Sequence, residues 1–294
     1  MSPLYPDRVR YPVTSQTEPK VPIKGGRLVP IPRTMPWWIV ILSICGLLIL
    51  LFVGSSASYQ ETFGFLASGV IRTLQLTLVG YLLALILGLV GGLGRISKNP
   101  VIYTMATLYV EVVRGVPLLV VLLYIAFVFA PQVSVFLNSS AESLNWPFLS
   151  DLSLILRNDF MRGALGLAIG YGAYLSEVYR AGIESIARGQ MEAARSLGMS
   201  YGQAMRYVIL PQAVRIILPP LGNDFIAMLK DSSLVSAIGA LPVDAELTLR
   251  GRMYSASTFK SFETWNSVAI LYLMMSLGLS VIVRYVEQHW SIPK

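Results

Sequence analysis

The chain has 294 residues, of which 54% are hydrophobic and only 13% are charged. Soluble globular domains carry about 25% charged residues, so this composition excludes an ordinary soluble domain and predicts an integral membrane protein. The formal net charge of +7 does not imply a nucleic-acid partner, because the basic residues gather between apolar segments and form no basic face interleaved with aromatic residues.

The first 64 residues combine a basic tail with one apolar run. Residues 1–35 hold six Lys and Arg and seven Pro, and we expect a disordered cytoplasmic tail. Residues 37–53 are uninterruptedly apolar and begin with two Trp, which favour the membrane interface. They predict a first membrane-spanning helix within an extra segment at 36–64. A cleaved signal peptide is the alternative, although its apolar region is usually only about 7–15 residues long. Cys45, the only cysteine, lies in this run, which excludes a disulfide within the chain.

Five further apolar segments predict an all-α, polytopic membrane protein with six spans. They cover residues 65–93, 101–130, 163–179, 216–239 and 265–285. The second of the five is too long for one straight span, and we expect a break at Pro117 with the freed carbonyl bonded inside the protein, because lipid offers no partner. Residues 131–162 are predicted to be a polar, irregular connection, and residues 240–263 a second polar connection.

The basic residues predict the orientation of the chain. Fifteen Lys and Arg lie in the N-terminal tail, around Arg95 and Lys98, in residues 180–215 and in the C-terminal tail, against five in the other two connections. Cytoplasmic segments carry the excess of Lys and Arg. Both termini and residues 180–215 are therefore expected on the cytoplasmic side.

A polar interruption at residues 189–211 predicts two short helices joined at a bend. The first should end at Gly198, where a left-handed residue commonly closes a helix. The second should begin at Ser200, because Gln203 three residues later completes a capping-box pattern. Pro211 is expected to end or kink this second helix.

This interruption resembles the EAA loop of ABC-transporter permeases. The matching residues are Glu192, Ala193, Ala194, Gly198, Val208, Leu210 and Pro211, with Val208 where the family usually has Ile. The resemblance implies a cytoplasmic coupling helix seated in a cleft of an ATP-hydrolysing subunit, within a loop at 180–215. The alternative is a short re-entrant or interfacial hairpin without a partner. Glu192 is expected in the first turn of its helix, where it would suit the helix dipole even without a coupling role.

Four further stretches make the chain similar to permeases for polar amino acids, the histidine- and glutamine-permease branch. They are Thr73-Leu-Gln-Leu-Thr77, Glu111-x-x-Arg114-Gly115-x-Pro117, Glu177-x-x-Arg180-x-Gly182-Ile183 and Leu229-Lys230-Asp231-Ser232-Ser233-Leu234. The resemblance implies a type I ABC importer permease with a five-helix core at 65–294 in the bacterial inner membrane. It implies ATPase subunits, a second permease subunit, identical or paralogous, and an extracytoplasmic amino-acid-binding protein as partners. The first 64 residues lie outside it.

No catalytic or metal-binding constellation is present in the sequence. There is no GxxxxGK[ST] phosphate loop and no Cys/His cluster. We therefore expect no cofactor on this chain, with ATP and Mg bound by the partner ATPase. An ion-coupled secondary transporter or channel is the alternative, because charges inside membrane spans suit either class. The discriminating feature is the loop at 180–215.

The candidate substrate path follows from the chemistry of an amino acid. A zwitterion needs a donor for its carboxylate and an acceptor for its ammonium group. The candidate residues are Glu111, Arg114, Gly115, Pro117, Glu177, Lys230, Asp231 and Ser232. The alternative is that Glu111 pairs with Arg114, and Glu177 with Arg180, because residues spaced i, i+3 are neighbours on a helix.

Overall fold

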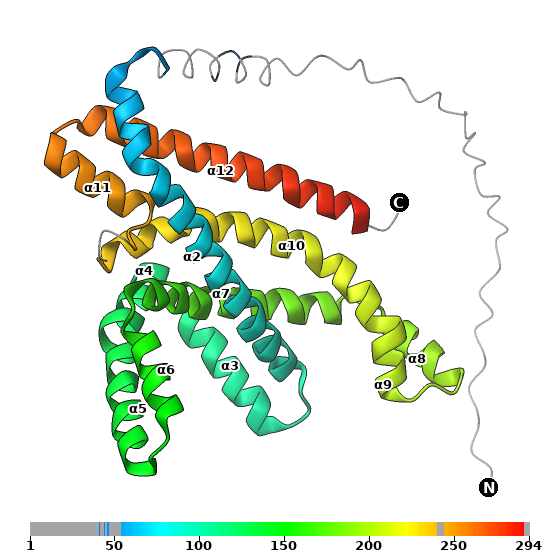
Figure 1. Ribbon diagram of the computed structural model, residues 1–294. Helices are drawn as coiled ribbons and strands as arrows, with labels where there is room; N and C mark the ends of the chain where they lie inside the picture. Colours follow the sequence, from blue (N-terminus) through cyan, green and yellow to red (C-terminus); the bar gives the residue numbers. More distant parts are fainter. Residues whose placement is uncertain (1–40, 42–43, 45, 47–53, 240–243, 291–294) are drawn as a thin grey trace, which may run out of the picture. The chain divides into compact units, whose positions relative to one another are not determined.

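The computed structural model describes residues 54–239 and 244–290, together with Ile41, Ile44 and Gly46. The predicted basic tail and most of the predicted first span lie outside the described residues. The chain divides into two units, Met1–Phe52 and Val53–Lys294, and helices α2 to α12 belong to the second. The secondary structure described there is entirely helical (Figure 1).

The helical elements of this unit follow one another with short connections. They are α2 (Ala57–Ile96), α3 (Pro100–Arg114), α4 (Leu118–Tyr124), the π-helical turn η1 (Ile125–Phe129), α5 (Ala130–Leu144), α6 (Pro147–Arg157), α7 (Asp159–Glu184), α8 (Arg188–Ser196), α9 (Tyr201–Ala204), the π-helical turn η2 (Met205–Ile209), α10 (Leu210–Asp231), the 3-10 helix η3 (Ser232–Ala237), α11 (Leu247–Thr258) and α12 (Ser261–Trp290).

Three helical stretches in the described part are long and apolar enough to cross a membrane. They are Ala57–Ile96, Leu118–Leu144 and Ser261–Glu287. The predicted helices at 163–179 and 216–239 correspond to α7 and α10, which are long but carry charged groups such as Glu177 and Asp224. The all-α membrane fold is therefore confirmed, whereas the number of six spans stays a prediction.

The core forms where α2 packs along α7. Leu76 of α2 is buried there beside Leu167 and Leu175 of α7. The two backbones approach closely, because a Cβ added at Gly91 would overlap the Oγ atom of Ser176. Small residues allow such contacts between membrane helices, and this close approach places Arg95 of α2 within reach of Glu177 of α7.

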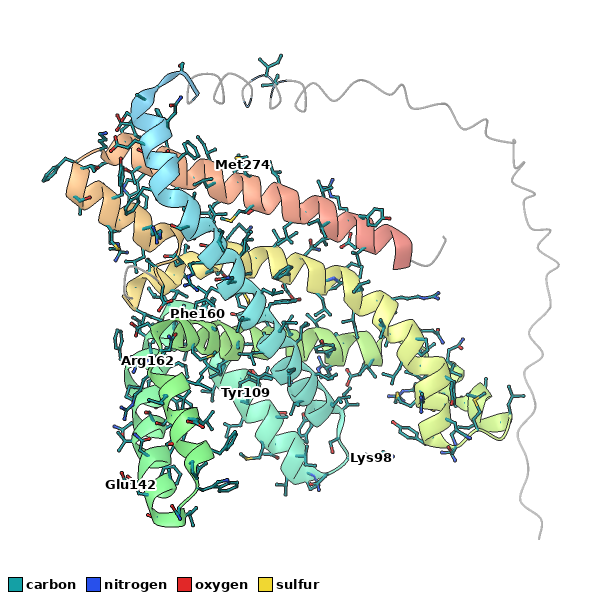
Figure 2. All side chains as sticks on the ribbon, in the orientation of Figure 1. Lys98, Tyr109, Glu142, Phe160, Arg162 and Met274 are labelled. Atoms are coloured by element: carbon teal, nitrogen blue, oxygen red, sulfur yellow. The ribbon has the colours of Figure 1, made fainter. Side chains whose placement is uncertain are left out.

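Helix α3 is fixed to the same core by a half-buried tyrosine. Tyr109 Oη donates a hydrogen bond of 2.8 Å to the carbonyl of Ile169 in α7 (Figure 2). The partly buried hydroxyl thereby has a hydrogen-bond partner within the protein. This bond places the end of α3, with Glu111 and Arg114, beside the second half of α7.

The predicted break at Pro117 is confirmed. Helix α3 ends at Arg114 and α4 begins at Leu118. Pro117 has no N–H to donate to the carbonyl of Val113, four residues before it. That carbonyl instead accepts a hydrogen bond of 3.4 Å from the N–H of Val116. The freed backbone group is thus bonded within the protein.

The prediction of an irregular connection at 131–162 is wrong. The helix continues through Pro131 to Leu144, and α6 returns alongside it as a helical hairpin (Figure 1). Ser134 Oγ donates to the carbonyl of Ser153, and Ser153 Oγ donates to Asn138 Oδ1. The polar residues that suggested an irregular loop bond the two helices to each other instead.

Pro211 does not end its helix, which contradicts the first of the two predicted outcomes, an end or a kink. The π-helical turn Met205–Ile209 precedes it, and the N–H of Leu210 bonds to the carbonyl of Met205, five residues back. The wider turn makes room for a residue that lacks an N–H, so helical structure runs from Tyr201 to Asp231 without interruption.

The connection at 240–263 contains a helix, α11, whose first turn is capped by a buried acid. Glu246 accepts the N–H groups of Thr248 at 2.6 Å and Leu249 at 2.7 Å, and Tyr272 Oη donates to it at 3.1 Å. Burial raises the pKa of the Glu246 carboxyl, and the backbone hydrogen bonds oppose that rise. Residues 240–243 lie outside the described part.

Candidate functional site

The α8–η2 unit, residues 188–209, is closed by the two caps that the sequence predicts. Gly198 has φ of +85°, and its N–H bonds to the carbonyl of Arg195 while that of Met199 bonds to Ala194. This is the Schellman arrangement for ending a helix. Ser200 and Gln203 then exchange side-chain and backbone hydrogen bonds in a complete capping box. Both local predictions are confirmed.

The two short helices pack on alanines and leave large side chains outside. Ala194 is 4% exposed and Ala204 is fully buried, which brings α8 against α9. Leu197, Tyr201 and Tyr207 have exposed fractions of 81%, 55% and 65%. Apolar groups exposed this far suit an interface with another protein.

Glu192 is not in the first turn of its helix, contrary to the prediction. Helix α8 begins at Arg188, so Glu192 is its fifth residue, and the first turn holds no acid. The expected dipole stabilisation is therefore lost, because it fades beyond the first turn. Glu192 and Ala193 are exposed, while Leu210 and Pro211 open the long helix α10.

An ion-pair row runs along the end of α7 and joins it to two other helices. Arg95, in the last turn of α2, contacts Glu177 Oε2 at 2.7 Å and Glu111 Oε1 at 3.5 Å. Glu177 also pairs with Arg180, and Arg180 pairs with Glu184. The structure therefore brings the candidates Glu111 and Glu177 together around a residue that sequence reasoning did not place there.

Arg114 does not pair with Glu111, so that alternative is wrong. Its guanidinium carbon lies 5.4 Å from the centre of the Tyr174 ring, a cation–π arrangement between α3 and α7. Gly115 and Pro117 form the break directly after it. The second alternative is confirmed in part, because Glu177 pairs with both Arg180 and Arg95.

The remaining candidates, Lys230, Asp231 and Ser232, lie at the end of α10 and the start of η3, and Asp231 contacts α7 at a different height from Glu177. Asp231 accepts a hydrogen bond of 2.7 Å from Tyr171 Oη, and Ser232 is buried and bonds to the Leu229 carbonyl. Lys230 is exposed. Tyr171 and Glu177 are separated by about 9 Å along the helix at ~1.5 Å per residue. The candidate path residues thus form two groups.

Two tyrosines connect these groups, and sequence reasoning gave them no role. The rings of Tyr171 and Tyr174 are 6.4 Å apart, so Arg114, Tyr174, Tyr171 and Asp231 form a continuous row. The spacing of three residues between the two tyrosines is visible in the sequence. Their partners, Arg114 on α3 and Asp231 on α10, are evident only from the structure.

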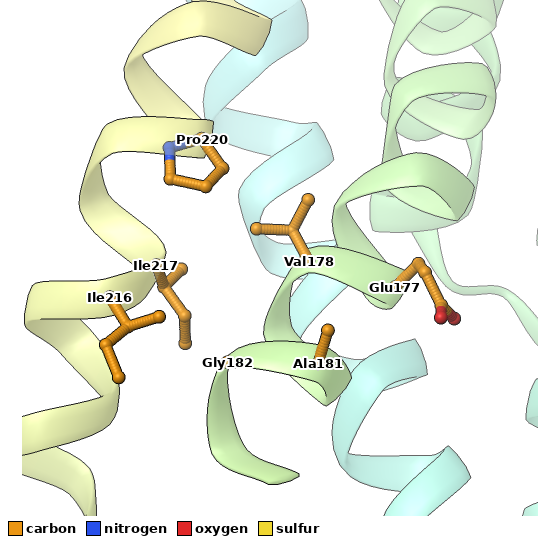
Figure 3. A pocket seen from close by; sticks show the side chains of 7 residues that line it. All are labelled: Glu177, Val178, Ala181, Gly182, Ile216, Ile217 and Pro220. Carbon is orange, nitrogen blue, oxygen red and sulfur yellow. The ribbon is translucent and has the colours of Figure 1, made fainter. Parts of the chain in front are cut away.

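A cavity of about 310 Å³ opens between α7 and α10 beside Glu177 (Figure 3). Its lining includes Glu177 and is otherwise apolar, formed by Val178, Ala181, Ile216 and Ile217 among others. Figure 3 shows the carboxylate of Glu177 turned away from the residues of α10. Glu177 is the one charged residue among the described residues that line this cavity, and its carboxylate points away from α10, so the cavity offers few polar partners to a zwitterion. The ion pairs that join α7 to α2 and α3 are therefore the better candidates.

Comparison with known proteins identifies the family. Residues 80–292 match the family described as the inner membrane component of binding-protein-dependent transport systems. The chain belongs to this family. The family's description places the chain in an inner membrane as a component of a transport system.

Two relatives and one solved structure cover most of the chain. The arginine transport system permease protein ArgU of Corynebacterium glutamicum is 37% identical over 77% of this chain and 68% of its own length. The glutamine transport system permease protein GlnP of Escherichia coli is 35% identical over 77% and 93%. A crystal structure of an amino acid ABC transporter with histidines superposes with a TM-score of 0.65 at 37% identity, covering 79% of this chain and 97% of that chain. The permease fold of an ABC importer is therefore established.

Proposed function

We propose that this chain is the membrane subunit of an ATP-driven importer that moves polar amino acids into the cytoplasm. The observation that carries the proposal is its 37% and 35% identity to relatives named for arginine and glutamine transport, one of them matched over 93% of its length. The solved transporter at 37% identity is also named for amino acids. The charged and hydrogen-bonding groups on α3, α7 and α10 are the kind a zwitterion needs.

The α8–η2 unit is proposed to seat in the ATPase partner. Glu192, Ala193, Ala194, Gly198, Leu210 and Pro211 are its motif residues, and the exposed Leu197, Tyr201 and Tyr207 would become buried in that interface. ATP and Mg would be bound by the partner alone. A second permease subunit and an extracytoplasmic binding protein complete the proposed assembly.

Reconstitution tests the whole proposal. The chain is co-expressed with the candidate ATPase, purified, and placed in vesicles with the binding protein. We expect the ATPase to co-purify, and labelled arginine or glutamine to accumulate only with ATP. Uptake driven by an ion gradient without ATP would instead support the ion-coupled alternative.

The proposed orientation, with the α8–η2 unit in the cytoplasm, predicts opposite labelling at two exposed positions. Gly202→Cys in α9 and Ala256→Cys in α11 are made singly in a Cys45→Ser background. With a membrane-impermeant maleimide, Ala256→Cys should label in intact cells, and Gly202→Cys only after permeabilisation. Labelling of both from one side would remove the basis for a cytoplasmic coupling unit.

A further inference from the structure

Arg95 ties three helices together at the end of the core. Its Nη1 bonds to Glu177 on α7 at 2.7 Å, and its Nη2 reaches Glu111 on α3 at 3.5 Å. The residue itself lies in the last turn of α2. These contacts span 82 and 16 positions of the sequence, so they form only in the folded core.

The burial of Arg95 argues against a role in stability alone. Its side chain is only 13% exposed, and its Nε is buried without a hydrogen-bond partner in the part of the chain that the structure describes. Desolvating a guanidinium while leaving one donor unpaired is costly, and apolar replacements of buried ion pairs are often as stable or more so. A retained charge at such a place therefore calls for a functional explanation.

The ion-pair row leads from Arg95 toward the α8–η2 unit. Glu177 pairs with Arg180, and Arg180 pairs with Glu184, the last residue of α7. Helix α8 begins at Arg188, after a connection of only three residues. A displacement of α8 would move Glu184 first, and the ion pairs would pass the movement through Arg180 and Glu177 to Arg95.

We propose that Arg95 is a positioning residue that transmits movement of the α8–η2 unit to α2 and α3. When α8 moves, the end of α7 moves with it, and the bonds of Arg95 carry α2 and α3 along. Without Arg95 the ion-pair link from the end of α7 to the ends of α2 and α3 is lost, so less of the movement reaches those two helices. This inference rests on the proposed function, because the movement is that imposed by the ATPase.

The test compares Arg95→Gln with Lys98→Gln in the reconstituted complex. Lys98 is an exposed basic residue just beyond α2, without an ion pair among the described residues, so the control removes the same charge (Figure 2). We expect Arg95→Gln to assemble and to hydrolyse ATP at the basal rate. Its substrate-stimulated ATP hydrolysis and its uptake should each fall at least about fivefold, the lower end of typical coupling between two sites. Lys98→Gln should match wild type. Arg95→Lys, which keeps one charged contact, should be intermediate.

Two outcomes overturn the inference. In the first, Arg95→Gln retains wild-type stimulation; in the second, it loses assembly and basal hydrolysis together, which makes the role structural. A wild-type complex without ATP-driven amino-acid uptake would instead overturn the proposed function. The wild-type measurement therefore separates the two failures.

Discussion

Gly198→Val is expected to lower ATP-driven uptake about five- to thirtyfold, with the permease still folded in the membrane. Valine at φ of +85° costs about 1–2 kcal/mol, and about 1.4 kcal/mol corresponds to tenfold in an equilibrium. An added Cβ would meet no other atom within 4 Å, so the effect isolates the backbone. Helix α8 would then lose its closing hydrogen bonds and its fixed direction relative to α9.

Gly202→Val is the matched control for this substitution. Gly202 lies in the same unit, also faces open space, and has no positive φ. Valine should therefore be accommodated with uptake close to wild type. The measurement is labelled amino-acid uptake and substrate-stimulated ATP hydrolysis in the same vesicles. Equal activity of the two variants would show that the left-handed turn is not required for coupling.

Glu192→Ala examines the same interface without touching the fold. The side chain is exposed and outside the first turn of α8, so its removal should not change the stability of the helix. Any loss of coupling would then report a contact with the partner ATPase. If both Glu192→Ala and Gly198→Val leave transport and hydrolysis coupled, the α8–η2 unit is not the coupling element.

Local features of this fold could be predicted from the sequence because their causes are local. The left-handed end at Gly198, the capping box at Ser200 and the break at Pro117 each depend on a few neighbouring residues, and all three are present. Glu192 was misplaced because the start of α8 is less sharply encoded than its end: the helix begins at Arg188, with no side-chain cap.

Features that depend on tertiary partners could not be predicted. The hairpin of α5 and α6 was missed because Asn138 and Ser153, typical of loops, bond to each other across it. The helix through Pro211 required a π-helical turn, for which the sequence gives no clear signal. Arg95 finds Glu177 at a separation of 82 positions, so its pairing appears only once α2 lies on α7.

Replacing Arg114 and replacing Glu177 test different things, because the two residues have different partners in the structure. Glu177 bonds to Arg95 and Arg180, so Glu177→Gln disturbs the ion-pair row as well as any substrate contact. Arg114 has no ion pair in the described part of the chain; it contacts the ring of Tyr174, and its charge acts on Glu177 only at longer range. Arg114→Gln is therefore the cleaner test of a donor for the substrate carboxylate.

Arg114→Gln is expected to raise the KM of uptake at least about tenfold, because losing one charged hydrogen bond to a carboxylate costs about 1.5–3 kcal/mol. Assembly and basal ATP hydrolysis should persist.

Tyr174→Phe keeps the ring face that positions the guanidinium of Arg114, so its KM of uptake should stay near wild type. Tyr174→Leu removes the ring, so its KM should rise toward that of Arg114→Gln. Glu177→Gln should lower maximal uptake as well as raise KM, because it also removes the charge from the ion pair with Arg95. Unchanged uptake and selectivity in both Arg114→Gln and Glu177→Gln would rule out a path through these residues, and failure of Glu177→Gln to assemble would assign that residue to structural pairing.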